Sequence, residues 1–223
     1  MKSALIVLVA GGVLSAATLT KDLSGYRGFQ LGSNLATIEK QVAAGRSEVK
    51  TIHRRPALIQ ELNWQPQSLG STPQRESVQE VVFSFYDGQL FQIAVTYDRY
   101  ETEGMTADDF IEAISATYGT AENPKLPSKP AQEQFGDQEE VVARWQDAQY
   151  SFDLIRGSYG PTFKMVGVLK RLEAPAQAAI DEAKRLDDQE APQRDAALKA
   201  DEAQAEQTKL EKARLLNKPK FRQ

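Results

Sequence analysis

The sequence contains no cysteine and a single histidine, His53. The first absence excludes disulfides, thiol nucleophiles, iron–sulfur clusters and zinc sites built from cysteine. The second excludes metal centres built from several histidines. Glycine-rich patterns typical of phosphate or dinucleotide binding are also absent. Most familiar catalytic constellations are therefore missing, and we predict no catalytic residue, no metal site and no cofactor.

The charges of the chain are nearly balanced. It has 27 basic and 31 acidic residues, and its formal net charge is −4. Such a balance gives no general attraction for nucleic acid or for anionic lipid, so neither is expected as a partner. The 223 residues are 41% hydrophobic and 26% charged, which is typical of a globular protein with a real core.

The first residues have the pattern of a secretory signal. Lys2 is followed by an apolar run from Ala4 to Leu14, then by the small residues Ser15, Ala16 and Ala17. This order predicts a signal peptide at residues 1–17, cleaved near Ala17, and export to the periplasm or the exterior. An N-terminal membrane anchor and a buried N-terminal strand are the alternatives. A bacterial lipid anchor is excluded because no cysteine exists to carry it.

Beyond residue 17 the composition divides the chain into a body and a tail. Residues 26–172 are dense in aromatic and β-branched residues and include both tryptophans, Trp64 and Trp145. Residues 173–223 are mostly alanine and charged or amide residues, with scattered leucines. We therefore expect an α+β body at 26–172 that holds the core, and a helical, charged, alanine-rich tail at 173–223.

Within the body, the strongest local signal is a β-hairpin. Apolar residues alternate along 81–85 and 91–97, and Asp87-Gly88 between them suits a two-residue turn. Further strands are expected at 49–54, 58–64, 141–145, 150–154 and 162–170. Helices are expected from Leu35 to about Gly45, capped by Ser33, and from Ala107 to Tyr118, where Thr106 and Asp109 suit a capping box. The expected fold is an antiparallel sheet with two helices on one face and the other face open.

The two halves of the body resemble one another. Glu80, Val81 and Val82 align with Glu140, Val141 and Val142, and the same offset places Asp87 on Asp147. A helix precedes each of these hairpins. The pattern therefore predicts a duplicated helix–hairpin unit, with repeat units at about 26–100 and 101–172. Chance similarity between two strand-rich segments is the alternative.

The tail shows a stripe of small residues at heptad-like spacing. Its first part contains Leu172, Ala176, Ala179, Ala183 and Leu186, and Pro192 is expected to break the helix. Beyond the proline, the same spacing continues at Ala196, Ala200, Ala203, Gln207 and Leu210. An alanine seam buries little area, so it would support only weak coiled-coil self-association. The alternative is a solvated helix that frays or lies along the body.

A family resemblance can be seen at the two helix entries. The stretch Phe29-Gln30-Leu31-Gly32-Ser33, followed by Leu35 and Ile38, resembles the opening of the SmpA/OmlA family of envelope lipoproteins and of the β-lactamase-inhibitor-protein fold. Gly104-Met105-Thr106 resembles the same entry a second time. The sequence departs from the lipoprotein family because the anchoring cysteine is missing. The resemblance implies a protein-binding module of the cell envelope, used twice in tandem, and assigns no catalytic residue.

Few residues offer catalytic chemistry. His53 is the only imidazole, so any acid–base scheme based on histidine would have to use it, and an ordinary surface histidine beside Arg54 and Arg55 is the favoured interpretation. Asp108, Asp109 and Glu112 complement the dipole of a helix N-terminus. The acids Asp137, Glu139 and Glu140 border a long loop from Thr120 to Gln138 and suit a solvated surface better than a calcium site. Ser158, between two glycines, lies in a turn without the strand–turn–helix context of a nucleophile.

The exposed faces of the strands remain as the place for function. Tyr86, Tyr97, Arg99 and Tyr100 are candidate binding residues, because tyrosine and arginine are enriched at strong interfaces. Core packing is the alternative for Tyr97. The sequence thus predicts an exported, non-catalytic protein that binds a protein or another envelope macromolecule through an open sheet face or its tail. A carboxylate-dependent hydrolase or sugar-active enzyme, and a tail-mediated oligomeric scaffold, are the alternatives.

Overall fold

The computed structural model describes residues 22–66, 77–122, 139–157 and 162–221. The expected signal peptide at 1–17, most of the long loop at 120–138 and the turn that contains Ser158 lie outside these ranges.

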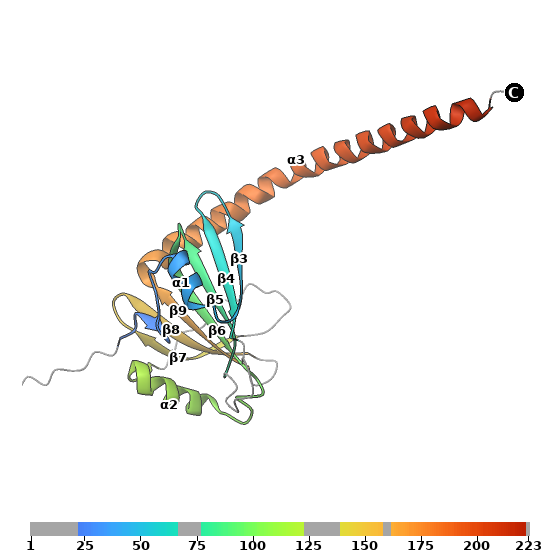
Figure 1. Ribbon diagram of the computed structural model, residues 1–223. Helices are drawn as coiled ribbons and strands as arrows, with labels where there is room; N and C mark the ends of the chain where they lie inside the picture. Colours follow the sequence, from blue (N-terminus) through green and yellow to red (C-terminus); the bar gives the residue numbers. More distant parts are fainter. Residues whose placement is uncertain (1–21, 67–76, 123–138, 158–161, 222–223) are drawn as a thin grey trace, which may run out of the picture.

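The body is built on one antiparallel sheet of seven strands (Figure 1). Its spatial order is β3-β4-β5-β6-β9-β8-β7, so β3 and β7 form the two edges. A separate two-stranded ribbon, β1 (Gly25–Tyr26) with β2 (Phe29–Gln30), precedes it. The strands of the large sheet are β3 (Arg46–His53), β4 (Ile59–Gln65), β5 (Val78–Tyr86), β6 (Gln89–Tyr97), β7 (Glu140–Gln146), β8 (Tyr150–Arg156) and β9 (Phe163–Leu169).

The predicted hairpin is confirmed as β5 and β6. Asp87 and Gly88 have φ angles of 46° and 77°, the left-handed values that a two-residue hairpin turn of this kind requires. The turn is also tied to the start of β4, because the backbone N–H of Leu58 donates to Asp87 Oδ1 at 3.0 Å. Asp87 therefore both forms the hairpin turn and helps to hold the neighbouring strand β4 against β5.

Two helices begin where capping side chains satisfy their first amides. In α2 (Ala107–Tyr118), Thr106 and Asp109 form the predicted capping box, and the hydrogen bonds from Thr106 lower the pKa of Asp109. In α1 (Leu35–Gln41), the expected cap at Ser33 is wrong by one residue. The cap is Asn34, whose Oδ1 accepts the N–H of Thr37 at 2.9 Å, because the chain turns into the helix one residue later.

The main core lies between the sheet and these two helices. Ile38 of α1 and Phe110 and Ile114 of α2 are buried in the same cluster as the inward-facing residues of the strands. The fit is tight at Gly167, where a Cβ would lie 2.1 Å from the ring atom Cε1 of Phe152. The largest fully buried side chains include Trp145, Phe83, Phe85, Phe152, Leu62 and Leu90.

The opposite face of the sheet is crossed by the long helix α3 (Lys170–Asn217), which a short 3-10 turn, η1 (Lys218–Phe221), follows. Helix α3 contacts β6 and β9, and its alanines Ala176, Ala179 and Ala183 are buried. Buried hydrophobic strand residues that do not belong to the main core lie on this face: Ile59, Phe91, Ala94 and Val168. The sheet face that we expected to be open is therefore covered in part by the start of the tail, as the alternative interpretation of the tail proposed.

The expected break at Pro192 is wrong. Helix α3 runs through both Pro175 and Pro192 as one element of 48 residues. A proline inside a helix removes one amide donor, which leaves the carbonyl one turn earlier without its helical partner. For Pro192 that carbonyl belongs to Asp188, an exposed residue, so water can take the place of the missing donor.

The two aligned hairpins occupy different places in the sheet. The hairpin β5–β6 lies near the centre, whereas β7–β8 lies at an edge, and the first half contributes four strands against three. Strands β6 and β9 pair between the two halves of the sheet. Counted outward from this pair, β5 takes the same position as β8, and β4 the same position as β7. Duplication of the helix–hairpin unit stays a prediction.

Candidate functional site

Helix α3 consists of two parts with different surroundings. We call residues 170–191 the anchored part, because it carries the three alanines buried against the sheet. We call residues 192–217 the arm, because every one of them is exposed. At about 1.5 Å per residue the arm is about 39 Å long. Figure 1 shows it leaving the body beyond the β3 edge of the sheet. It is therefore the most accessible large surface in the described part of the chain.

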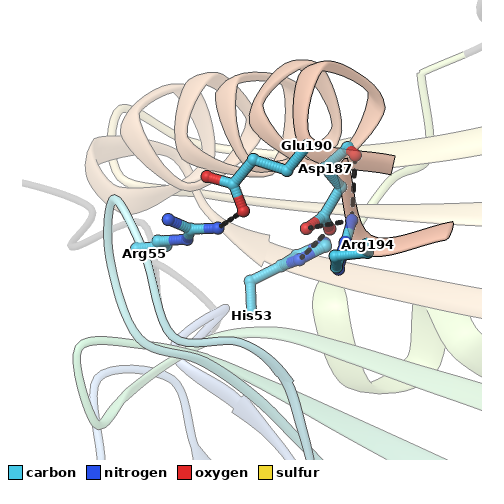
Figure 2. Close-up of polar contacts among 5 residues, drawn as sticks. All are labelled: His53, Arg55, Asp187, Glu190 and Arg194. Atoms are coloured by element: carbon cyan, nitrogen blue, oxygen red, sulfur yellow. Dashed lines mark hydrogen bonds and ion pairs between the residues drawn. The ribbon is translucent and has the colours of Figure 1, made fainter. Parts of the chain in front are cut away.

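The joint between the anchored part and the arm is held by polar contacts to the β3–β4 hairpin. Figure 2 shows Glu190 of α3 meeting Arg55 of the hairpin turn in an ion pair. Beside it, Nδ1 of His53 lies 3.9 Å from Oδ2 of Asp187. Arg194, the third residue of the arm, donates to the backbone carbonyl of Asp187 at 2.8 Å. These contacts fix the direction in which the arm leaves the body.

The electrostatics of the joint follow from the ion pair. Hydrogen bonding to the Arg55 guanidinium lowers the pKa of Glu190 below its ordinary value, and the carboxylate raises the pKa of Arg55. Both side chains are more than a third exposed, so water screens their attraction. The joint orients α3 more than it stabilises the fold.

The single imidazole is thus part of a structural contact. The side chain of His53 is only 15% exposed, and the acid that faces it is Asp187 of α3. Sequence reasoning singled out His53 but missed its partners Asp187, Glu190 and Arg194. The signal that could have found them is charge complementarity between a basic turn, His53-Arg54-Arg55, and an acidic stretch, Asp187 to Glu190.

Three of the other acids considered as catalytic candidates have structural partners. Asp109 caps α2, and Glu140 accepts a hydrogen bond from Arg156 at 2.6 Å. Glu139 lies 4.0 Å from the Nζ of Lys164. Asp137 is outside the described ranges. Within those ranges, no group of three or more acidic or histidine side chains is arranged to hold a metal ion.

The predicted binding residues do not form one surface. Tyr97 is buried, its ring lies 5.1 Å from that of Phe110, and burial raises the pKa of its hydroxyl. It belongs to the core, as the alternative interpretation held. Tyr86 is half-buried beside the turn of the β5–β6 hairpin, while Tyr97 pairs with Val78 at the far end of the same hairpin. Beyond that end, Arg99 stacks over Tyr100, which is 68% exposed.

Shallow hollows elsewhere on the surface offer little chemistry. One, at the end of α2, is lined by uncharged residues: Ile111, Ser115, Gly119, Thr120 and Ala121. Another follows one side of the arm, between Asp201 and Lys212, and is formed by that helix alone. Among the described residues, no helix is both long enough and apolar enough to cross a membrane.

Comparison with known proteins adds no relative. No family model matches this chain, and no match was found among curated proteins or solved structures.

Proposed function

We propose that this protein is an exported, non-catalytic protein of the cell envelope or the extracellular space that binds a macromolecular partner through the arm of α3. The observation that carries the proposal is the exposure of every residue from 192 to 217 in a helix whose preceding turns are packed on the sheet. A helix without tertiary contacts gains no stability from burial. Its length therefore favours a role in contacts outside the body.

The arm presents both apolar and charged side chains to a partner. Four leucines are well exposed: Leu198 at 60%, Leu210 at 63%, Leu215 at 70% and Leu216 at 71%. Between residues 194 and 206 there are four acidic and two basic residues, whereas between 209 and 220 there are five basic residues and one acidic residue. A partner protein whose surface becomes acidic toward the end of the arm, and which offers apolar contacts to these leucines, would complement this pattern.

As the surface that binds the partner, the arm is favoured over the sheet face, which the sequence also suggested. The anchored part of α3 covers the part of that face formed by Phe91, Ala94 and Val168. The arm is also favoured over a self-associating scaffold, since its alanine seam buries too little area for a stable coil of its own. The resemblance to envelope-protein modules supports the same general role.

Export rests on the N-terminal pattern of Lys2, the apolar run and the small residues to Ala17. The test is cell fractionation combined with mass spectrometry of the intact mature chain. We expect a chain that starts near Thr18 in the exported fraction. An intact N-terminus in the cytoplasm would contradict export while leaving partner binding open to its own test.

Partner binding is tested with a photo-crosslinking amino acid at Leu210 in the arm and, as a matched control, at Glu112 on α2. Both positions are exposed and both are helical. In intact cells we expect a defined adduct of constant mass from position 210 and none from position 112. The proposal fails if position 210 gives no adduct above the control.

A further inference from the structure

The two edges of the large sheet differ in their surroundings. Beside the edge strand β7, Glu122 and Arg144 form a bridge in which each backbone N–H donates to the carbonyl of the other. Strand β3 pairs with β4 on one side, and among the described residues no strand pairs with its outer side. Residues 46–52 are all exposed. An edge of this length presents unpaired backbone donors and acceptors to a further strand.

The side chains of β3 also differ from the rest of the body surface. Val49 is 39% exposed and Ile52 is 43% exposed, and Tyr100 is the other large exposed hydrophobic residue of the described body. Glu48 and Lys50 lie on one face of the strand, where Lys50 Nζ is 3.3 Å from Glu48 Oε2. Val49 lies on the opposite face, since side chains alternate along a strand.

We propose that β3 pairs antiparallel with β3 of a second copy of this chain, about a two-fold axis at Val49. In this register Val49 lies opposite Val49 of the second copy. Glu48 of each copy lies opposite Lys50 of the other, and Ser47 lies opposite Thr51. The sheet then continues from one copy into the next, and the interface is the same patch on both, as two-fold symmetry requires.

The order of residues selects this register over its neighbours. The segment Ser47-Glu48-Val49-Lys50-Thr51 reads as hydroxyl, acid, valine, base, hydroxyl, so a two-fold at its centre pairs every residue with a complement. A shift of the axis by one residue would place Glu48 opposite Glu48, or Lys50 opposite Lys50. Like charges directly opposite each other destabilise a strand pair, whereas opposite charges stabilise it.

Helix α3 leaves the centre of this edge uncovered. Its polar contacts to the hairpin reach His53, at the end of β3, and Arg55, in the turn. The five residues of the complementary segment come before them in the strand and are exposed. Charged side chains on an edge discourage pairing with strands of arbitrary sequence, which favours a second copy as the occupant.

The pairing is tested first by disulfide trapping in the full chain. Because the chain has no cysteine, Val49→Cys introduces the only thiol. In the proposed register this thiol lies opposite the same thiol of the second copy. Lys40→Cys, at an exposed position on α1, is the matched control. We expect Val49→Cys to form a disulfide-linked dimer at least about tenfold faster than the control, because pairing raises the local thiol concentration. Equal rates, or no dimer from Val49→Cys, would overturn the proposal.

Charge exchange provides the second measurement. Sedimentation velocity should show a concentration-dependent dimer, which Glu48→Lys or Lys50→Glu alone should weaken about tenfold by placing like charges opposite each other. An equimolar mixture of the two variants should recover it, because each then finds the complementary charge. Thermal unfolding controls for folding, and both positions are exposed. A wild-type chain that stays monomeric, or a dimer that neither variant weakens, overturns the proposal without bearing on partner binding by the arm.

Discussion

The anchored part and the arm of α3 have similar sequences and opposite surroundings. Ala176, Ala179 and Ala183 are buried against the sheet. Ala196, Ala200 and Ala203 are also three or four residues apart, but they are exposed. A stripe of small residues therefore identifies the face of a helix that allows another surface to approach closely. It does not identify what approaches, because that depends on whether a surface of matching shape lies within reach.

The geometry at the end of β9 explains why only the first part is buried. Helix α3 begins directly after β9, at Lys170, and crosses the sheet over β6 and β9. Alanine side chains let the helix backbone lie close to Ala94 and Val168. Beyond the joint at Asp187 and Glu190 the sheet ends, so the same helix continues into solvent as the arm.

The largest effect is expected from a charge placed in the anchored stripe. Ala176→Glu would place a carboxylate at a position that is fully buried. We expect a loss of about 3 kcal/mol in the free energy of unfolding, measured by urea denaturation. The matched variant Ala200→Glu in the arm should change that free energy by less than about 0.5 kcal/mol. Similar losses in both variants would remove the distinction between the two parts.

A smaller effect is expected at the joint. Asp187 faces His53 on one side and Arg194 on the other, and its side chain is 47% exposed. Asp187→Ala should therefore lower the free energy of unfolding by no more than about 1 kcal/mol. Its clearer result should be faster amide exchange in the last turns of the anchored part. Unchanged exchange there would mean that the joint does not orient the arm.

The joint should also respond to acid. The pKa of Glu190 is lowered in the folded protein, so its ion pair with Arg55 stabilises the joint above the ordinary glutamate value of 4.5. That contribution is lost as the pH falls from there through the lowered pKa. We expect amide exchange in the β3–β4 turn to accelerate in this window, and Glu190→Gln to abolish the acceleration. An identical acid response in wild type and Glu190→Gln would contradict this assignment.

The smallest effect on stability is expected from removing the arm itself. A chain that ends after Ala191 keeps all three buried alanines and the Arg55–Glu190 pair. Its unfolding free energy should change by less than about 0.5 kcal/mol, while crosslinking to the partner should be lost. A loss of stability above about 1 kcal/mol would show that the arm contributes to the body.

Several elements could be predicted from sequence because their causes are local. The Asp87-Gly88 turn with alternating strands, and the Thr106–Asp109 capping box, depend on residues next to one another. The sequence predicts the cap of α1 at Ser33, but the cap is Asn34, since neighbouring residues suited for capping compete and the path of the chain into the helix decides between them. Tyr97 could not be assigned to core or surface, because both faces of β6 carry apolar residues.

From sequence alone one could predict most of the helices and strands of the body, the turn at Asp87-Gly88, and a helical tail with a stripe of alanines among charges. The folded structure was needed to show that the first part of this stripe is buried, that Pro192 does not end the helix, and that His53 meets Asp187. The reason is physical. Periodicity and capping act over a few residues, whereas burial and charge pairing depend on surfaces that are brought together from distant parts of the chain.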